Sequence, residues 1–239
     1  MNGELAARRA ELAAACRVLA ARDLAPGFLG HVSLRVDEHR LLVRCRGAEE
    51  RGLAYTVPED IRLVDLDGNP GAAGELDGYA APNELPLHTE VLRRRPDVDA
   101  VVHAHPAAVV AADLAGLGIR PIVGAYDIPG AHLAAGGVPV YPRGVLIRNR
   151  RLAAEMVAAM ADRPVVLLRA HGLTSTGPTV PHAVLRALAV QTIAAMALSV
   201  SQAGATPTDL PAEDLAELPD LGGGFNIDTA WRHELARLP

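Results

Sequence analysis

Two short, mostly apolar segments constrain the fold of this chain more than any other feature. They cover residues 98–103 (VDAVVH) and 165–168 (VVLL). Segments of this length, rich in valine and bounded by proline or glycine, are typical of buried strands. Helical periodicity surrounds them, at 83–95, 106–114, 150–161 and 181–202. The alternation predicts an α/β fold in which helices cover both faces of one sheet.

The N-terminal part of the chain adds a helix and a group of strands. Apolar residues recur at helical spacing over 4–21, and strand patterns follow at 32–36, 41–43 and 61–66. Strands this close in sequence favour an antiparallel meander. The expected architecture is therefore three-layer α/β/α with a mainly antiparallel central sheet. Because no linker or repeat divides the sequence, we expect one domain over residues 1–239, with a tail from about residue 203.

Composition excludes several classes of function. The net charge of −5 leaves no positive surface of the kind that binds nucleic acid. No basic segment leads into an apolar one near Met1, and no run approaches the roughly 18 apolar residues of a membrane span. We therefore expect a cytoplasmic protein without nucleic-acid or membrane partners. Cys16 and Cys45 are too few for a disulfide framework or a thiolate zinc site.

Lysine is absent from the chain, so all 23 basic residues are arginine. A Schiff base or a pyridoxal phosphate anchor needs an amine that can lose its proton, and the pKa of arginine is too high for that role. If the protein makes or breaks carbon–carbon bonds, the developing negative charge must be stabilised by another group.

Histidines lie at the ends of both predicted buried strands. His103 and His105 are two residues apart, which places their side chains on the same face of a strand, about 6 to 7 Å apart along the backbone. His171 closes the second strand, where Gly172 would let the chain turn sharply. Three neutral imidazoles suit zinc or another divalent transition metal. A set of polar strand caps is the alternative.

Three segments resemble the class II, metal-dependent aldolase and adducin family, which also includes ribulose-phosphate epimerases. They are GHVSLR at 30–35, NELPLHTEVLRRRPDVDAVVHAHP at 83–106 and LLRAHGL at 167–173, in the order typical of that family. The resemblance extends from about Leu5 to the last long helix. It implies one divalent metal ion per chain and a cyclic homotetramer with sites at the subunit boundaries.

The resemblance also implies roles for four residues. His103, His105 and His171 would ligate the metal, for which we expect zinc, with manganese or iron as alternatives. Glu84 would be the catalytic acid/base, and a fourth ligand when the site is empty. The lyase branch of the family usually carries Glu at this position and the epimerase branch Asp, so the sequence favours a lyase.

The surroundings of Glu84 agree with that role. Asn83 and Glu84 stand at the expected start of a helix, where the helix dipole favours an anion and the side chain would face away from the core. We expect burial to raise the pKa of Glu84 and the ion to balance it. An ordinary first-turn glutamate is the alternative. His88 shares a helix face with Glu84 and could orient it, although a role in packing or in supporting the site from behind its contacting residues is favoured.

Departures from the family pattern bear on the substrate. Sugar-phosphate enzymes of the family usually have Asn at His31, a Thr/Ser-Gly turn where this chain has VRCRGAEERG, and Ser-Ser where it has Pro82-Asn83. Groups that cradle a phosphate are thus missing. Arg44 and Arg46 could form a fork for a substrate carboxylate, unless they lie on a solvated hairpin. We expect His31, Asn83 and Arg46 to bind the substrate.

These substitutions resemble a branch of the family that decarboxylates hydroxylated aromatic acids. We therefore expect a metal-dependent carbon–carbon lyase that decarboxylates such an acid through a metal-stabilised enolate. An aldolase acting on a non-phosphorylated hydroxy-keto acid is the alternative within this chemistry. Two other classes stay open. One is an adducin-like interaction module, against which the intact cluster argues, and the other is a non-haem iron oxygenase with the same histidines.

The tail GGGFNIDTAWRHELARLP fits a segment that contacts a neighbouring subunit. It contains the only tryptophan of the chain, Trp231, after a run of glycines. Aromatic side chains of this kind are enriched at protein interfaces. We expect the tail to close the substrate pocket; a tail packed on its own subunit is the alternative.

Overall fold

The central element is a seven-stranded sheet with the strand order β4-β2-β1-β6-β9-β8-β7. The computed structural model describes residues 2–221 and 224–239. Every strand pair in this sheet is antiparallel except β7 with β8, so the prediction of a mainly antiparallel sheet is confirmed. A second, two-stranded sheet pairs β3 (Arg46–Gly47) with β5 (Tyr79–Ala80). In the order of the large sheet, the strands are Ile61–Asp65, Arg40–Arg44, His31–Arg35, Ala100–Ala104, Gly172–Gly177, Val165–Leu168 and Val140–Tyr141.

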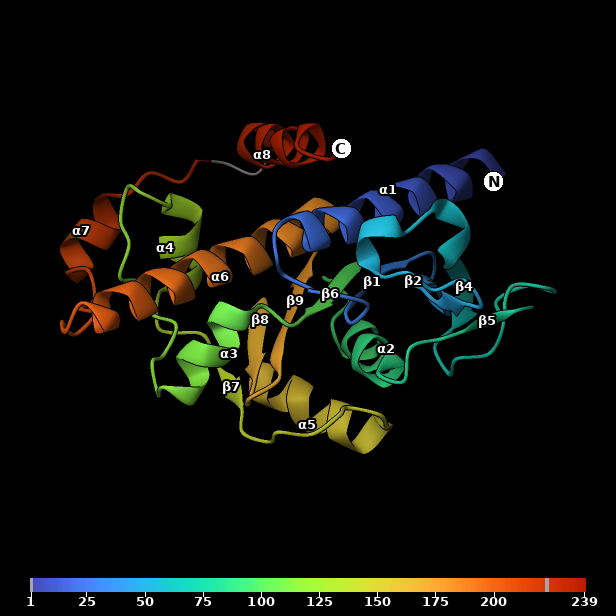
Figure 1. Cartoon of the computed structure of the whole chain (residues 1–239), viewed down its shortest axis with the longest axis horizontal. Helices are drawn as coiled ribbons and strands as arrows, with labels where there is room; N and C mark the ends of the chain where they lie inside the picture. The colour runs from blue at the N-terminus through green and yellow to red at the C-terminus, as the bar shows by residue number, and fades with distance from the viewer. Residues whose placement is uncertain (1, 222–223) are drawn as a thin grey trace.

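Helices cover both faces of the large sheet (Figure 1). Strand β6 contributes to both layers because its side chains alternate: Ala100 and Val102 belong to one core and Val101 to the other. The predicted three-layer α/β/α architecture is thereby confirmed. The first layer contains α1 (Asn2–Ala21), α3 (Ala107–Leu114), α4 (Ile128–Ala134) and α6 (Val180–Gln202), and the second α2 (Leu85–Arg94) and α5 (Arg150–Met160). Two 3-10 turns, η1 (Leu53–Tyr55) and η2 (Pro58–Asp60), lead into β4.

The sequence pattern does not predict β9, which begins directly after His171. Its residues, GLTSTG, are all buried, although most of them are polar or lack a side chain. The hydroxyls can be buried because each has an acceptor. Ser175 donates to the Ala183 carbonyl at 2.8 Å, Thr176 to the Pro164 carbonyl at 2.9 Å, and Thr174 to the Met156 sulfur at 3.6 Å. These partners come from other elements, so no local pattern could reveal the strand.

The chain reverses at residues 169–171, one step before the glycine at which the sequence analysis expected the turn. Gly172 is needed for a different reason. A Cβ atom at this position would lie 2.2 Å from the carbonyl oxygen of Ala104. Only glycine therefore lets β9 approach the end of β6 this closely.

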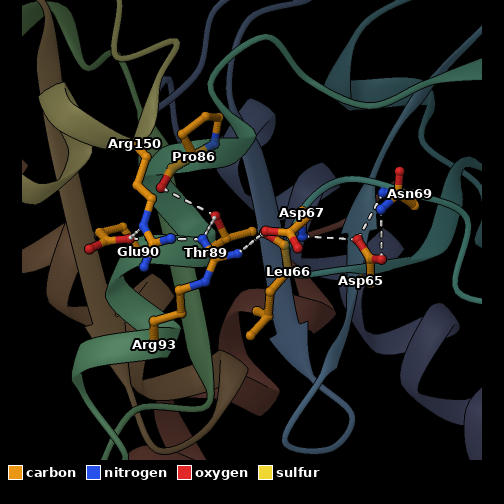
Figure 2. Close-up of polar contacts among 9 residues, drawn as sticks. All are labelled: Asp65, Leu66, Asp67, Asn69, Pro86, Thr89, Glu90, Arg93 and Arg150. Carbon is orange, nitrogen blue, oxygen red and sulfur yellow. Dashed lines mark hydrogen bonds and ion pairs between the residues drawn. The ribbon is translucent and has the colours of Figure 1, made fainter.

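Helix α2 is fixed by polar contacts that Figure 2 shows. The carboxylate of Glu90 is 1% exposed and lies 3.2 Å from the guanidinium of Arg150 on α5. One turn further along α2, Arg93 donates to the carbonyl oxygen of Leu66, just after β4, at 2.8 Å. Two elements that are distant in sequence thus hold α2, and with it the residue that precedes the helix.

The C-terminal segment forms α7 (Ala212–Glu217) and α8 (Gly224–Ala236), while Gly222 and Gly223 lie outside the described residues. Helix α8 lies beside α1 and α6 (Figure 1), where Trp231 packs against the first core. Glu234 is buried and pairs with Arg22 at 2.9 Å. The described part of the tail therefore packs on its own chain, as in the alternative given above.

Helix α6 is long and apolar enough to cross a membrane by length and composition. The expectation that no run reaches this length is wrong for α6, in which Arg186 is the only arginine, lysine or carboxylate. Half of its most apolar window is buried within the molecule, and its buried face belongs to the first core. A core helix of a globular protein passes the same test.

Candidate active site

Four ionisable side chains meet at the end of β6. They are His103 on the strand, His105 just after it, His171 in the turn before β9 and Glu84 before α2, and their ligand atoms all lie within 4.8 Å of one another. The Nε2 atoms of His103 and His105 are 2.7 Å apart. Pairing of β9 with β6 brings the third histidine to the same edge. The structure thus brings together all four residues that the sequence analysis selected.

Hydrogen bonding orients the ring of His103 toward this cluster. Its Nδ1 lies 3.0 Å from the Leu173 carbonyl oxygen, which can only accept, so Nδ1 donates this bond and Nε2 faces the cluster. Burial, followed by the charge of His103, lowers the pKa of His105 to about 3, so this imidazole is neutral at pH 7. Neutral imidazoles that converge with a carboxylate oxygen are the donor set of a divalent transition metal, and the residues present therefore fit such an ion.

Glu84 closes the cluster on the side of α2 and is only 4% exposed. Its Oε1 accepts a hydrogen bond from the Ile147 backbone N–H at 2.8 Å, and its Oε2 lies 3.2 Å from His103 Nε2. Burial raises the pKa of Glu84, but the hydrogen bond and charge of His103, the Ile147 N–H and the charge of His171 outweigh burial and lower it to about 2.

Two expectations about Glu84 are therefore wrong. Its carboxyl does not face away from the core, and its pKa is lowered rather than raised. Helix α2 begins at Leu85, two residues after the expected start at Asn83, and Glu84 is the N-cap residue, so the Glu84 side chain does not lie on a helix face. It turns into the histidine cluster instead.

A cavity of about 440 Å³ opens beside the cluster. The three predicted substrate-binding residues, His31, Asn83 and Arg46, all line it. The guanidinium of Arg46 lies 5.5 Å from the centre of the Phe28 ring, and no carboxylate in the described part of the chain pairs with it. The full lining is Leu29, Gly30, His31, Arg46, Pro82, Asn83, Glu84, His105, Gly144, Val145, Leu146, Ala170 and His171.

Arg44 does not reach this cavity. Its side chain is buried, with Nη2 2.5 Å from a carboxylate oxygen of Glu50 and Nε donating to the Thr56 hydroxyl at 3.1 Å. A guanidinium buried this deeply requires such a partner. The expectation of a fork made by Arg44 and Arg46 is therefore wrong, because the first arginine stabilises the loop and only the second faces the cavity.

His88 contacts His31 rather than Glu84. Its Nε2 lies 2.6 Å from His31 Nδ1, and its Nδ1 lies 2.6 Å from the hydroxyl of Ser33. Burial, followed by the charges of neighbouring histidines, holds the pKa of His31 well below its usual range. Sequence reasoning missed Ser33, although its position two residues after His31 on a strand places both side chains on one face.

Residues 10–198 match the family model of the class II aldolase and adducin N-terminal domain. The chain belongs to the class II aldolase and adducin family. The match includes the cluster and every residue predicted to bind substrate, and the resemblance found in the sequence is confirmed. Membership of the class II aldolase and adducin family, together with the His/Glu cluster, suggests a divalent metal.

Similar proteins place the chain in one branch of this family. It is 70% identical over 234 residues to a 3,4-dihydroxyphthalate decarboxylase of Arthrobacter keyseri, covering 98% of this chain and 94% of that protein. It is 68% identical over 238 residues to a 3,4-dihydroxyphthalate decarboxylase of Terrabacter sp., covering 100% of both. These relatives confirm that the chain is an enzyme, a lyase of the branch that was expected from the sequence.

Solved structures agree on the fold. An aldolase II superfamily protein from Pseudomonas syringae superposes with a TM-score of 0.80 at 22% sequence identity, covering 96% of this chain and 91% of that one. An L-fuculose 1-phosphate aldolase superposes with a TM-score of 0.71 at 22% identity, covering 88% and 93%. At this level of identity the likeness shows that the class II aldolase fold is shared.

Proposed function

We propose that this family member decarboxylates 3,4-dihydroxyphthalate, with one divalent metal ion held by His103, His105 and His171. The observation that carries the proposal is the position of Arg46, which no carboxylate of the described residues pairs with, in the same cavity as the His/Glu cluster. The substrate is proposed from the decarboxylases that are 70% and 68% identical to this chain, which act on 3,4-dihydroxyphthalate. A dihydroxylated aromatic dicarboxylate offers the oxygens that such a cavity could bind.

Arg46 binds the carboxylate that the product retains. Arginine presents planar paired donors that match a carboxylate, and this one has no competing anion in the described residues. Asn83 and His31 line the same cavity and offer neutral polar groups to the remaining substrate oxygens. These three residues orient the ring so that the carboxyl group to be lost faces the cluster.

A bound metal, for which we propose zinc, supplies Lewis-acid stabilisation of the negative charge that develops on oxygen next to the reacting carbon. Glu84 moves the proton. Its low pKa keeps it ionised before substrate binds, so it can accept the proton of a substrate hydroxyl. When the carbon–carbon bond breaks, carbon dioxide leaves, the electron pair stays on the ring carbon, and Glu84 returns its proton to that carbon.

The proposal is tested by measuring carbon dioxide released from 3,4-dihydroxyphthalate by metal-free protein reloaded with zinc, manganese or iron. We expect one product lacking one carboxyl group, no aldehyde and no oxygen consumption. Oxygen uptake would indicate an oxygenase, and release of an aldehyde from hydroxy-keto acids would indicate an aldolase. Absence of turnover with all three metals would contradict the proposal.

The role of Arg46 is tested by Arg46→Gln. Loss of the charged pair with the retained carboxylate should raise KM about tenfold or more, because hydrogen bonds to charged groups contribute roughly 1.5 to 3 kcal/mol. Arg51→Gln is the matched control, since Arg51 lies 5.3 Å from the Tyr55 ring and is absent from the cavity lining. Equal KM values for both variants would exclude Arg46 from substrate binding.

We propose further that the chain is one domain over residues 1–239, with a C-terminal segment from about 203, and assembles as a homotetramer with sites at subunit interfaces. Three apolar side chains at or beside the cavity, Phe28, Leu29 and Leu146, are 54%, 40% and 47% exposed, which is typical of a surface that a partner covers. Sedimentation equilibrium measures the assembly, and a monomer at micromolar concentration would contradict it.

We also propose a cytoplasmic location, which agrees with the two buried free cysteines.

A further inference from the structure

Three buried polar side chains form a hydrogen-bonded series that extends from the core to the cavity. Ser33 on β1 and His88 on α2 are both 0% exposed, and His31 on β1 is 4% exposed. Ser33 Oγ lies 2.6 Å from His88 Nδ1, and His88 Nε2 lies 2.6 Å from His31 Nδ1. These are short hydrogen bonds between buried groups, and each link permits only one proton.

The direction of these hydrogen bonds follows from Ser33, at the buried end of the series. Ser33 must use its hydroxyl proton, and among the described residues His88 is the only hydrogen-bond partner of that hydroxyl. If His88 donated from Nδ1 instead, the Ser33 proton would be buried without an acceptor. Ser33 therefore donates to Nδ1 of His88. Burial lowers the pKa of His88 to about 3, so its ring is neutral and carries its single proton on Nε2.

The same reasoning determines which ring nitrogen of His31 carries the proton. His88 Nε2–H donates to His31 Nδ1, so the proton of a neutral His31 is on Nε2. Within residues 2–221 and 224–239, no side chain or backbone group hydrogen-bonds this nitrogen, and the ring lines the cavity. His31 also pairs with His103 across β1 and β6, with ring centroids 5.0 Å apart, which places it directly beside the cluster.

We propose that Ser33 and His88 act as positioning residues that fix His31 in its Nε2–H tautomer, so that His31 donates a hydrogen bond to an anionic oxygen of the substrate next to the cluster. This role rests on the proposed function for the identity of the substrate only. The tautomer itself is a property of the free enzyme, and it decides whether the cavity presents a donor or an acceptor at this point.

The tautomer is measured by long-range ¹H–¹⁵N correlation spectra of the zinc-loaded protein with ¹⁵N-labelled histidine, with the His31 signals assigned by His31→Gln. We expect a protonated Nε2 and an unprotonated Nδ1 at pH 7. In Ser33→Ala the hydroxyl that fixes the direction of these hydrogen bonds is lost, so both tautomers of His31 should appear. A wild-type spectrum with the proton on Nδ1 would overturn the proposal.

Two substitutions of His88 separate positioning from packing. His88→Gln keeps a donor and an acceptor, whereas His88→Leu keeps only bulk. With 3,4-dihydroxyphthalate, kcat/KM should fall about tenfold or more in His88→Leu and stay within threefold of wild type in His88→Gln, at equal zinc content. An equal fall in both variants would contradict the positioning role. If wild type does not turn this acid over, the proposed function fails, and the spectra still decide the tautomer.

Discussion

Asp113 holds the turn that carries His171. Its Oδ2 accepts a 2.8 Å hydrogen bond from the backbone N–H of Ala170, and its Oδ1 lies 3.3 Å from the Arg169 guanidinium. Ala170 has a φ of 53°, a left-handed conformation that a residue with a Cβ rarely adopts without support. Asp113 belongs to α3, the helix that follows His105. One carboxylate thus connects the two segments that supply the three histidines.

Asp113→Ala should therefore weaken metal binding without removing a ligand. Loss of an outer partner that orients a ligand typically costs about 10- to 100-fold in metal affinity. Asp113→Asn is the control, because its amide oxygen can still accept from the Ala170 N–H. Chelator competition measures the affinity, and equal zinc affinity in both variants and wild type would contradict the coupling.

His103→Ala should lose the metal. One imidazole of three is removed, and the remaining incomplete set should bind zinc more weakly by orders of magnitude. Metal content after dialysis against a mild chelator is the measurement. His39→Ala, a change of an exposed histidine on the β1–β2 turn, should keep its metal. Full metal content in His103→Ala would show that the ligand assignment is wrong.

Glu84→Gln should keep the fold and the metal and lose turnover. Glutamine preserves the shape and can still accept the hydrogen bond from Ile147, but it cannot carry the proton, a function worth about 10² to 10⁴ in rate. Zinc content, thermal unfolding and kcat are compared with those of Glu38→Gln, an exposed control. A kcat within threefold of wild type would exclude the acid/base role.

Gly172→Ala should disrupt the His/Glu cluster by displacing the backbone of β9. The added Cβ would lie 2.2 Å from the Ala104 carbonyl oxygen, so β9 must move away from β6, at a cost of about 3 kcal/mol or more. Gly118→Ala is the control, because its nearest neighbours are flexible side-chain atoms of Arg120 at 3.6 Å. Urea denaturation gives both stabilities, and similar midpoints would show that the strands are not constrained as described.

Cys16 and Cys45 should not react with thiol reagents in the folded protein. Burial is the main cause that raises the pKa of each thiol to about 12, so at pH 8 almost no thiolate forms at either site. A disulfide-exchange reagent should label neither residue in native protein and both in denaturant. Rapid labelling of the native protein would contradict the packing around them.

The sequence alone determined the features that depend on local spacing. Apolar periodicity located β6, β8 and most of the helices, and therefore the three layers. The spacing of His103 and His105 placed both rings on one face, because side chains alternate along any strand. The motifs around these histidines were enough to predict the family and the lyase chemistry, because they combine residue type with order along the chain.

Only the tertiary structure decided what surrounds each side chain. Glu84 turns into the cluster and has a lowered pKa because His103 and the Ile147 N–H, which are distant in sequence, lie around it. Arg44 is buried against Glu50 while Arg46, two residues on, faces the cavity. Burial, hydrogen-bond partners and pKa depend on contacts between segments far apart in the chain, and local periodicity carries no information about those contacts.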